Sequence, residues 1–289
     1  MINKIQNNKI SIEVNSFGAE LWSLKKVGND FEYLWQGDTK YWGNRSPVLF
    51  PTVGAVKNSK YRIGDKEYPL GNHGFALNSE FTLIEESDTK LVYSLKTNEE
   101  IKKMYPFNFE LILSYALNES SVKIQYTVKN LDTQNIYFQL GTHPGFNMPL
   151  DSDLKFDDYY IEFNKKEQCN RLFFDKANLT ITNKDEDGLE GQKLNLKHEI
   201  FYEGAAIYKN INSDQLVLKS DKGARFVKFS FDKFPALGVW QKPDAPYICI
   251  EPWHGISDDD NYTGEFQDKA MIITLDKNSD YNCFMNIEI

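Results

Sequence analysis

The stretch Ser121–Asn130, SVKIQYTVKN, decides the fold class. Its apolar residues occupy every second position, namely Val122, Ile124, Tyr126 and Val128. Polar or charged residues fill the positions between them. Successive side chains of a β-strand point to opposite faces, so this alternation predicts a strand with one buried face and one solvated face.

The same composition recurs on both sides of this stretch. Short segments rich in β-branched and aromatic residues occur at 9–16, 90–98, 109–117, 135–143, 215–220, 224–231 and 247–253. Turn-forming residues separate them at 118–120, 130–132 and 220–223. Many short strands without alternating helices predict an all-β protein, an antiparallel β-sandwich formed as a single domain over residues 1–289.

Two segments depart from the strand pattern. Residues 98–103 precede Tyr105-Pro106, and we expect one or two helical turns there. Residues 183–197 form the most polar region, which we expect to be a long exposed loop.

The bulk composition excludes several classes of partner. The chain has 289 residues with a net charge of -9, and only four of those residues are arginines. Phosphate binding needs clustered lysine and arginine, so we expect no nucleic-acid or membrane partner. Aromatic residues reach 14%. They suit both a β core and the apolar faces of sugar rings, which leaves the two roles open at this point.

Motifs for metals, cofactors and covalent catalysis are missing from the sequence. The three cysteines are widely spaced, and no HxH, HExxH or paired-cysteine pattern suggests a metal site. Neither a glycine-rich phosphate loop nor a GxSxG motif occurs. We also find no signal peptide and no apolar stretch of bilayer length, so a cytoplasmic location is expected. We therefore expect cofactor-free, metal-free proton transfer or simple binding.

Ionisable residues gather among glycines, prolines and aromatics at four places: 41–51, 71–76, 141–147 and 250–253. His143 and Glu251 each end an apolar strand and precede a proline, which predicts side chains at the rim of a sheet. With His73 and Arg45, they suffice for acid–base chemistry on hydroxyl groups. A structural alternative is that the histidines fill turns and that Glu251 forms a buried ion pair with Arg45.

These blocks resemble a known family. YWGNRSPVLFPTVGAV (41–56), NHGFA (72–76), GTHPGFNMPL (141–150) and CIEPWHGISD (249–258) look like those of the aldose 1-epimerase (galactose mutarotase) superfamily. They are most similar to a branch of short bacterial members named after a lactose-operon protein. The likeness runs from about residue 5 to the C-terminus. It implies a β-supersandwich with an open sugar cleft on its concave sheet.

The resemblance also implies residue roles. Glu251 would act as general base on the anomeric hydroxyl, and His143 as general acid to the ring oxygen. His73 would bind the ring-side oxygens, and Arg45 would hold sugar hydroxyls. The further candidates for contact with the sugar are Asn72, Trp240, Trp253 and Phe146, with Trp42 and Phe75 as additional apolar candidates. We expect His143 to be partly exposed, so that a nearby carboxylate favours its protonated form.

One position departs from the family pattern. Many relatives carry an aspartate near Gly204, where it holds sugar hydroxyls, whereas this chain reads FYEGAA at 201–206. Glu203 would point to the opposite face if the register is kept. The sugar is therefore left open.

Three functions remain in view. The leading hypothesis is mutarotation of a free aldohexose. The second is mutarotation of a hexose 6-phosphate, for which Arg62, Lys57 and Lys60 are the nearest basic candidates in sequence. The third is a non-catalytic sugar-binding or regulatory protein that keeps the fold. Glycoside hydrolysis is disfavoured because only one carboxylate can be placed. The oligomeric state is open between monomer and dimer.

Overall fold

Alternating burial along the strands builds two large antiparallel sheets. The computed structural model describes residues 1–175, 180–183 and 188–289, and side chains for 1–173 and 188–289. Along β10 (Ser121–Asn130) buried residues alternate with less buried ones, as the sequence predicts. The first sheet runs, in spatial order, through β17 (Leu189–Asn195), β14 (Tyr160–Cys169), β19 (Gln215–Lys219), β20 (Val227–Asp232), β24 (Asp280–Glu288), β10, β9 (Phe109–Asn118), β8 (Lys90–Lys96) and β7 (Thr82–Ser87).

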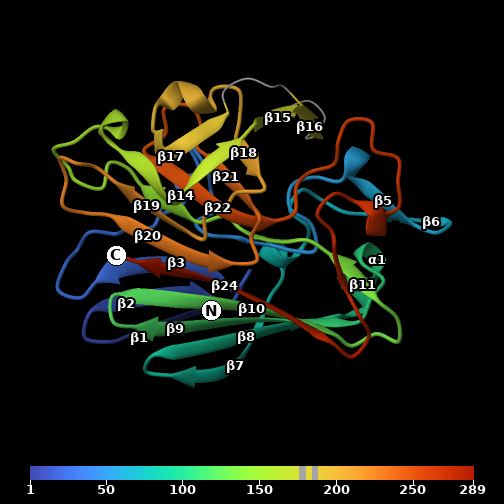
Figure 1. Ribbon diagram of the computed structural model, residues 1–289. Helices are drawn as coiled ribbons and strands as arrows, with labels where there is room; N and C mark the ends of the chain where they lie inside the picture. The colour runs from blue at the N-terminus through green and yellow to red at the C-terminus, as the bar shows by residue number, and fades with distance from the viewer. Residues whose placement is uncertain (176–179, 184–187) are drawn as a thin grey trace.

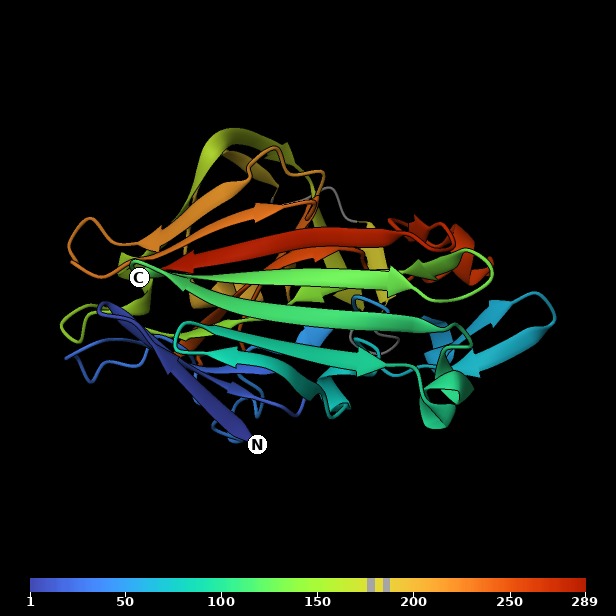
Figure 2. The ribbon, with the colours of Figure 1, turned by 90° about the horizontal axis from the view of Figure 1, so that it is seen from below.

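The second sheet carries Glu251, one of the candidate catalytic residues. In spatial order it contains β16 (Thr180–Asn183), β15 (Arg171–Asp175), β18 (Ala206–Lys209), β21 (Ala236–Trp240), β22 (Tyr247–His254), β12 (Leu140–Thr142) and β4 (Val48–Leu49), and β13 (Gly145–Asn147) also pairs with β22. In Figure 1, β18, β21 and β22 lie above β24, β10, β9 and β8 of the first sheet, and Figure 2 shows β24, β10 and β9 side by side. The all-β sandwich prediction is confirmed.

Smaller elements complete the described fold. A three-stranded antiparallel sheet contains β1 (Ile2–Gln6), β2 (Ile10–Asn15) and β3 (Glu20–Lys26). A hairpin contains β5 (Lys60–Ile63) and β6 (Lys66–Pro69), and β11 (Ile136–Phe138) pairs with the distant β23 (Ile273–Leu275). The short helices are α1 (Glu99–Met104), η1 (Lys57–Ser59), η2 (Ala76–Asn78), η3 (Phe156–Asp158), η4 (His198–Phe201) and η5 (Phe266–Asp268).

The helical prediction is confirmed by α1. The side chain of Asn98 caps this helix by accepting the backbone N–H of Ile101. The predicted loop at 183–197 is wrong over 189–195, because β17 pairs there with β14 at the sheet edge. An edge strand with one solvated face can be polar, so its composition does not reveal it. Residues 184–187 of that prediction lie outside the described residues.

The main core fills the space between the two sheets. It takes Val122, Ile124 and Val128 from the first sheet and Ile248 and Ile250 from the second. The single-domain organisation stays a prediction. Among the residues described, no helix combines the length and the apolar character that crossing a bilayer requires.

Candidate active site

Strand β22, YICIEPWH, presents two different faces. Ile248 and Ile250 enter the main core between the sheets. The alternate positions belong to two smaller clusters on the other face, Cys249 to one and Trp253 to the other. Glu251 lies between them, in the middle of the strand. The expectation that Glu251 ends its strand is therefore wrong, because Pro252 is tolerated within β22.

A cavity of about 730 Å³ opens over this face. Its size falls within the roughly 300–1,000 Å³ typical of small-molecule sites. The residues that line it come from β4, β18, β21, β22, η2, η4 and the connecting loops: Trp42, Asn44, Pro47, Leu49, Gly54, Asn72, His73, Leu77, His143, Phe201, Gly204, Ala205, Ile207, Trp240, Lys242, Pro243, Glu251, Trp253 and Ser257.

Glu251 and His143 meet at the wall of this cavity. Glu251 Oε2 lies 3.2 Å from His143 Nε2. Glu251 is 1% exposed, and its Oε2 makes no hydrogen bond within the described part of the chain. Burial is the main reason that the pKa of Glu251 is raised well above its usual value. The Arg45–Glu251 ion pair considered from the sequence does not form, because Glu251 contacts His143 instead.

The ring of His143 is held between aromatic neighbours. It stacks on Trp42 with ring centroids 4.6 Å apart, and it meets the rings of His73 and Trp240 edge-on. His143 is 8% exposed, so the expectation of partial exposure is wrong. Burial, followed by the proximity of His73, lowers the pKa of His143 well below its usual value.

The backbone fixes which nitrogen of His73 carries its proton. The main-chain N–H of Gly54 donates to His73 Nδ1 at 3.1 Å, and the main-chain N–H of His73 donates to Gly54 O at 2.8 Å. An accepting Nδ1 requires the proton of the neutral ring to sit on Nε2. Burial lowers the pKa of His73 to about 4, so the ring is neutral near pH 7. His73 therefore offers the cavity a neutral N–H donor.

Tryptophans supply the apolar walls. Trp42, Trp240 and Trp253 line the cavity, as does Asn72 among the predicted polar contacts. Gly238 pairs with Glu251 across β21 and β22, and a Cβ there would lie 2.7 Å from the Trp253 ring. The glycine thus gives the Trp253 ring the space it occupies beside Glu251.

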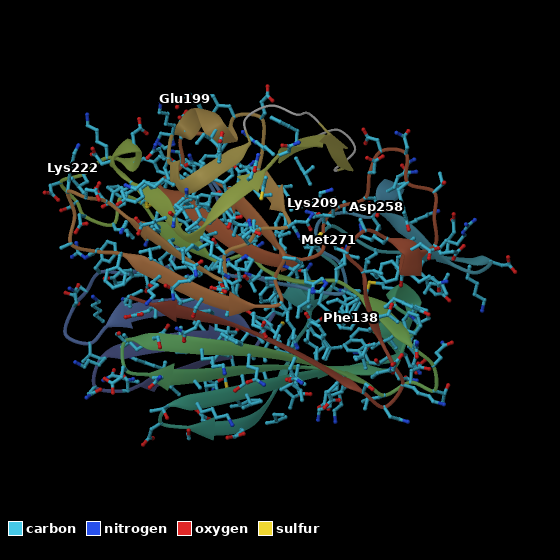
Figure 3. The ribbon with its side chains drawn as sticks, in the orientation of Figure 1. Phe138, Glu199, Lys209, Lys222, Asp258 and Met271 are labelled. Atoms are coloured by element: carbon cyan, nitrogen blue, oxygen red, sulfur yellow. The ribbon has the colours of Figure 1, made fainter. Side chains whose placement is uncertain are left out.

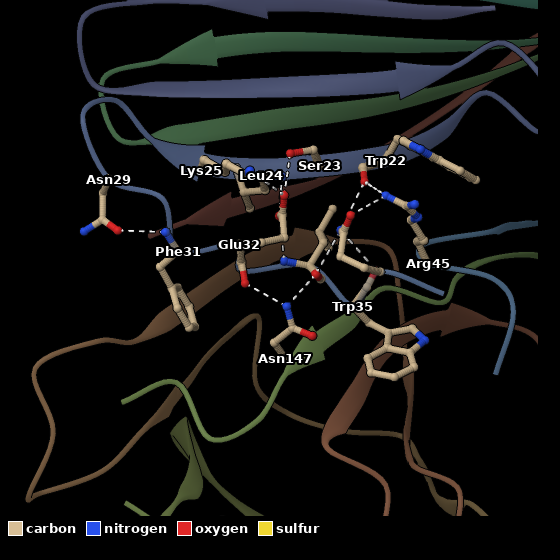
Figure 4. Close-up of polar contacts among 12 residues, drawn as sticks. Trp22, Ser23, Leu24, Lys25, Asn29, Phe31, Glu32, Trp35, Arg45 and Asn147 are labelled. Atoms are coloured by element: carbon tan, nitrogen blue, oxygen red, sulfur yellow. Dashed lines mark hydrogen bonds and ion pairs between the residues drawn. The ribbon is translucent and has the colours of Figure 1, made fainter. Parts of the chain in front are cut away.

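Two predicted contacts lie outside the cavity lining. The guanidinium of Arg45 stacks on Trp22, and its Nη1 donates to Trp22 O and to Gln36 Oε1 (Figure 4). Phe146 is fully buried and packs edge-on against Phe229 between the sheets. We therefore drop both from the proposed sugar contacts. The additional candidate Phe75 likewise packs in the core.

Comparison with known proteins gives the family. The family model described as aldose 1-epimerase matches residues 1–273. This chain belongs to the aldose 1-epimerase family. The LacX proteins of Lactococcus lactis subsp. lactis, chromosomal and plasmid, are each 34% identical to this chain over 264 residues, covering 88% of this chain and 88% of the relative.

Solved structures of aldose 1-epimerase relatives share the whole fold. A galactose mutarotase related enzyme from Lactobacillus acidophilus is 31% identical, with a TM-score of 0.94 over 100% of this chain and 97% of that one. A galactose mutarotase-like protein from Lactobacillus casei ATCC 334 is 30% identical, with a TM-score of 0.93 over 100% and 99%. The resemblance read from the sequence blocks is confirmed.

Among the residues described as lining the cavity, Glu251 carries the single carboxyl group. Gly204 lines the wall, whereas Glu203 is exposed and is absent from the lining. Sequence reasoning missed three polar lining residues, Asn44, Lys242 and Ser257. Asn44 and Ser257 fall inside the quoted family blocks, so their position in those blocks was a usable signal.

The predicted phosphate ligands occupy a different place. Lys57, Lys60 and Arg62 line a second cavity of about 490 Å³ and not the one over Glu251. Arg62 Nε also pairs with a Glu265 carboxylate at 2.7 Å. These residues therefore cannot serve a hexose 6-phosphate bound next to Glu251. Lys242 is the cation within the lining described for the first cavity.

Three residues with metal-binding chemistry come together in the fold. One potential ligand atom each from His143, Cys249 and Glu251 lies within 4.8 Å of the others. Burial raises the pKa of both the Cys249 thiol and the Glu251 carboxyl, so both groups tend to keep the proton that a metal would displace. Function without a metal or cofactor stays a prediction.

Proposed function

We propose that this protein is a mutarotase that interconverts the α and β anomers of an aldohexose without a cofactor. One observation carries the proposal: Glu251 Oε2 and His143 Nε2 lie 3.2 Å apart on the wall of a cavity that also presents tryptophan rings. A carboxyl group and an imidazole at one small-molecule site supply a base and an acid in the same pose.

The proposed reaction moves one proton between two oxygens of the sugar. The Glu251 carboxylate takes the proton from the anomeric hydroxyl O1 while the His143 imidazolium gives a proton to the ring oxygen O5. The C1–O5 bond breaks and C1 becomes an aldehyde carbonyl. Rotation about C1–C2 turns the other face of the aldehyde to O5, and the reverse transfers close the ring as the other anomer.

Burial sets the resting protonation of this pair. The raised pKa of Glu251 and the lowered pKa of His143 favour a carboxylic acid beside a neutral imidazole. A carboxylate beside an imidazolium holds the same number of protons, so moving one proton from Glu251 to His143 interconverts the two states. In the reactive state, each ring opening adds one proton to Glu251 and removes one from His143. The pair therefore keeps the same number of protons, and no proton exchange with solvent is required.

His73 supports the ring oxygen in this proposal. Its Nε2–H can donate to O5, where negative charge develops as the C1–O5 bond breaks. The lining described for this cavity contains a single carboxyl group, that of Glu251. Inverting and retaining glycosidases generally use two, so isomerisation fits the site better than glycoside hydrolysis.

Optical rotation tests the proposal directly. Freshly dissolved α-glucose or α-galactose is mixed with wild-type protein and with the Glu251→Gln variant. Positioned acid–base groups contribute roughly 10²–10⁴-fold, so the variant should fall to the rate in buffer. Glu20→Gln is the matched control, because Glu20 is also buried but its Oε1 accepts N–H bonds from Arg45 and Ser46, outside the cavity lining.

The alternatives predict other results. If wild type and Glu251→Gln both match the buffer rate, catalysis on these sugars is wrong. Sugar binding by calorimetry without a change in rotation then indicates a non-catalytic binding protein. Lys242 in the cavity lining motivates a parallel assay with a hexose 6-phosphate.

A further inference from the structure

The 54–57 segment connects the cavity over Glu251 with a buried ion pair. On one side, Gly54 makes two hydrogen bonds with His73. Its N–H donates to His73 Nδ1, and its carbonyl oxygen accepts the main-chain N–H of His73. Gly54 itself has a positive φ of 69°. A Cβ on Gly54 would lie 1.9 Å from Ser257 Oγ, so only glycine fits between these neighbours.

On its other side the segment is fastened to Ser257 and Asp258. Ala55 N–H donates to Ser257 Oγ at 3.1 Å, and Asp258 N–H donates to Ala55 O at 3.0 Å. Lys57 N–H donates to Asp258 Oδ2 at 2.8 Å. Asp258 thus holds the segment through both its main chain and one carboxylate oxygen, while the other oxygen is left for a separate partner.

That partner is the buried ammonium group of Lys269. Lys269 Nζ lies 2.5 Å from Asp258 Oδ1, and the two side chains are 1% and 4% exposed. Removing two charges from water carries a penalty that their attraction repays only with good geometry, so such a pair adds little net stability as a rule. Asp258 lies beside the β5–β6 hairpin and η5 (Figure 3), where Asp258 and Lys269 line the second cavity.

We propose that the Asp258–Lys269 ion pair is a positioning element that holds the 54–57 segment in place and thereby fixes the orientation and tautomer of His73. Only the kinetic consequence of this inference rests on the proposed mutarotase function. Lys269 fixes one carboxylate oxygen, which keeps the other aimed at Lys57 N–H. The segment between Lys57 and Gly54 then presents the Gly54 N–H to His73 Nδ1.

Without the ammonium group this chain of contacts loosens. An uncompensated carboxylate at Asp258 turns toward water or takes up a proton, and the bond to Lys57 N–H weakens. His73 has a left-handed backbone with φ of 64°, a conformation that surrounding contacts must maintain. Once the Gly54 contact is lost, Nδ1 and Nε2 compete for the ring proton, and the donor facing the cavity is no longer assured.

Imidazole nitrogen resonances report the tautomer of His73 directly. The spectrum is simple to assign, because the chain has only four histidines. Proton–nitrogen correlation spectra of wild type should show His73, assigned with a His73→Gln variant, as a single Nε2–H tautomer. Lys269→Met should give a mixture of tautomers at His73. Lys269→Arg keeps the cation and should keep the wild-type signature, since the adjoining cavity of about 490 Å³ has room for the larger head group.

Two further variants separate positioning from general stability. Val128→Ala creates a void in β10, a strand of the first sheet, and should lower the unfolding temperature without changing the His73 signal. Asp258→Asn with Lys269→Met removes both charges but keeps a carbonyl oxygen for Lys57 N–H, so it should fold and restore the single tautomer. This double variant keeps the test informative if Lys269→Met does not fold.

Rates complete the test. Misplacing a catalytic group by about 1 Å can cost about 100-fold, so Lys269→Met should lower kcat/KM for mutarotation by about 10- to 100-fold. An unchanged His73 tautomer in Lys269→Met overturns the inference, even if mutarotation is found. A changed tautomer in a protein that mutarotates no sugar supports the positioning and removes only the proposed function.

Discussion

The stability at acidic pH of the protein without sugar is a sensitive probe of the His73 environment. The perturbation is His73→Gln, because a glutamine oxygen can still accept the Gly54 N–H that now bonds to Nδ1. Glutamine does not titrate, so the variant lacks the protonation of the His73 imidazole at low pH. We expect it to resist acid better than wild type.

The magnitude follows from the pKa of His73 in the two states. Its pKa is about 4 in the folded protein and near 6.5 in the unfolded chain. Between these values the unfolded state binds the proton and the folded state does not, so folding free energy is lost as pH falls from 6.5 toward 4. Between about pH 7.5 and about pH 4.5 the loss from His73 amounts to about 2.5 kcal/mol.

Urea unfolding at those two pH values measures this loss. Wild type should lose about 2.5 kcal/mol more than His73→Gln, because the other titrating groups largely cancel between the two proteins. Removing His73 also removes one cause of the lowered pKa of His143, which adds to the difference in the same direction. Equal losses for the two proteins would show that His73 titrates normally and would refute the partly buried, neutral donor.

Three further substitutions test the limits of the site. Arg45→Gln should lower stability by about 1–2 kcal/mol through loss of its contacts with Trp22, while kcat/KM stays within about threefold, as chemical denaturation and optical rotation will show. Gly238→Ala should push the Trp253 ring, cost about 1–3 kcal/mol, and raise KM for the sugar more than it lowers kcat. Lys242→Gln should leave neutral hexoses unaffected and weaken hexose 6-phosphate binding by at most about fivefold, measured by calorimetry, because Lys242 is exposed.

The sequence predicts the sheets well where strands have one buried face and one solvent-exposed face. The alternation along 121–130 is a local property, and β10 follows it residue by residue. The edge strand β17 is different, because pairing on one side only leaves its polar residues in solvent. No local pattern distinguishes such a strand from a loop.

The site is predictable in its members but less so in its contacts. His73, His143 and Glu251 stand in recognisable blocks, and the cavity brings all three together. Arg45 also stands in such a block, yet its partners Trp22 and Gln36 belong to segments that only the fold brings near. Burial depends on the same long-range packing, so the low exposure of His143 cannot be foreseen from neighbours in sequence.

A crystal structure of the protein with glucose or galactose bound would show whether Glu251 and His143 act on the sugar as the proposed base and acid. We expect O1 within hydrogen-bonding distance of the Glu251 carboxyl group and O5 facing His143, with the pyranose against the tryptophan rings. A sugar bound elsewhere, or bound here with O1 and O5 both turned away from this pair, would contradict it.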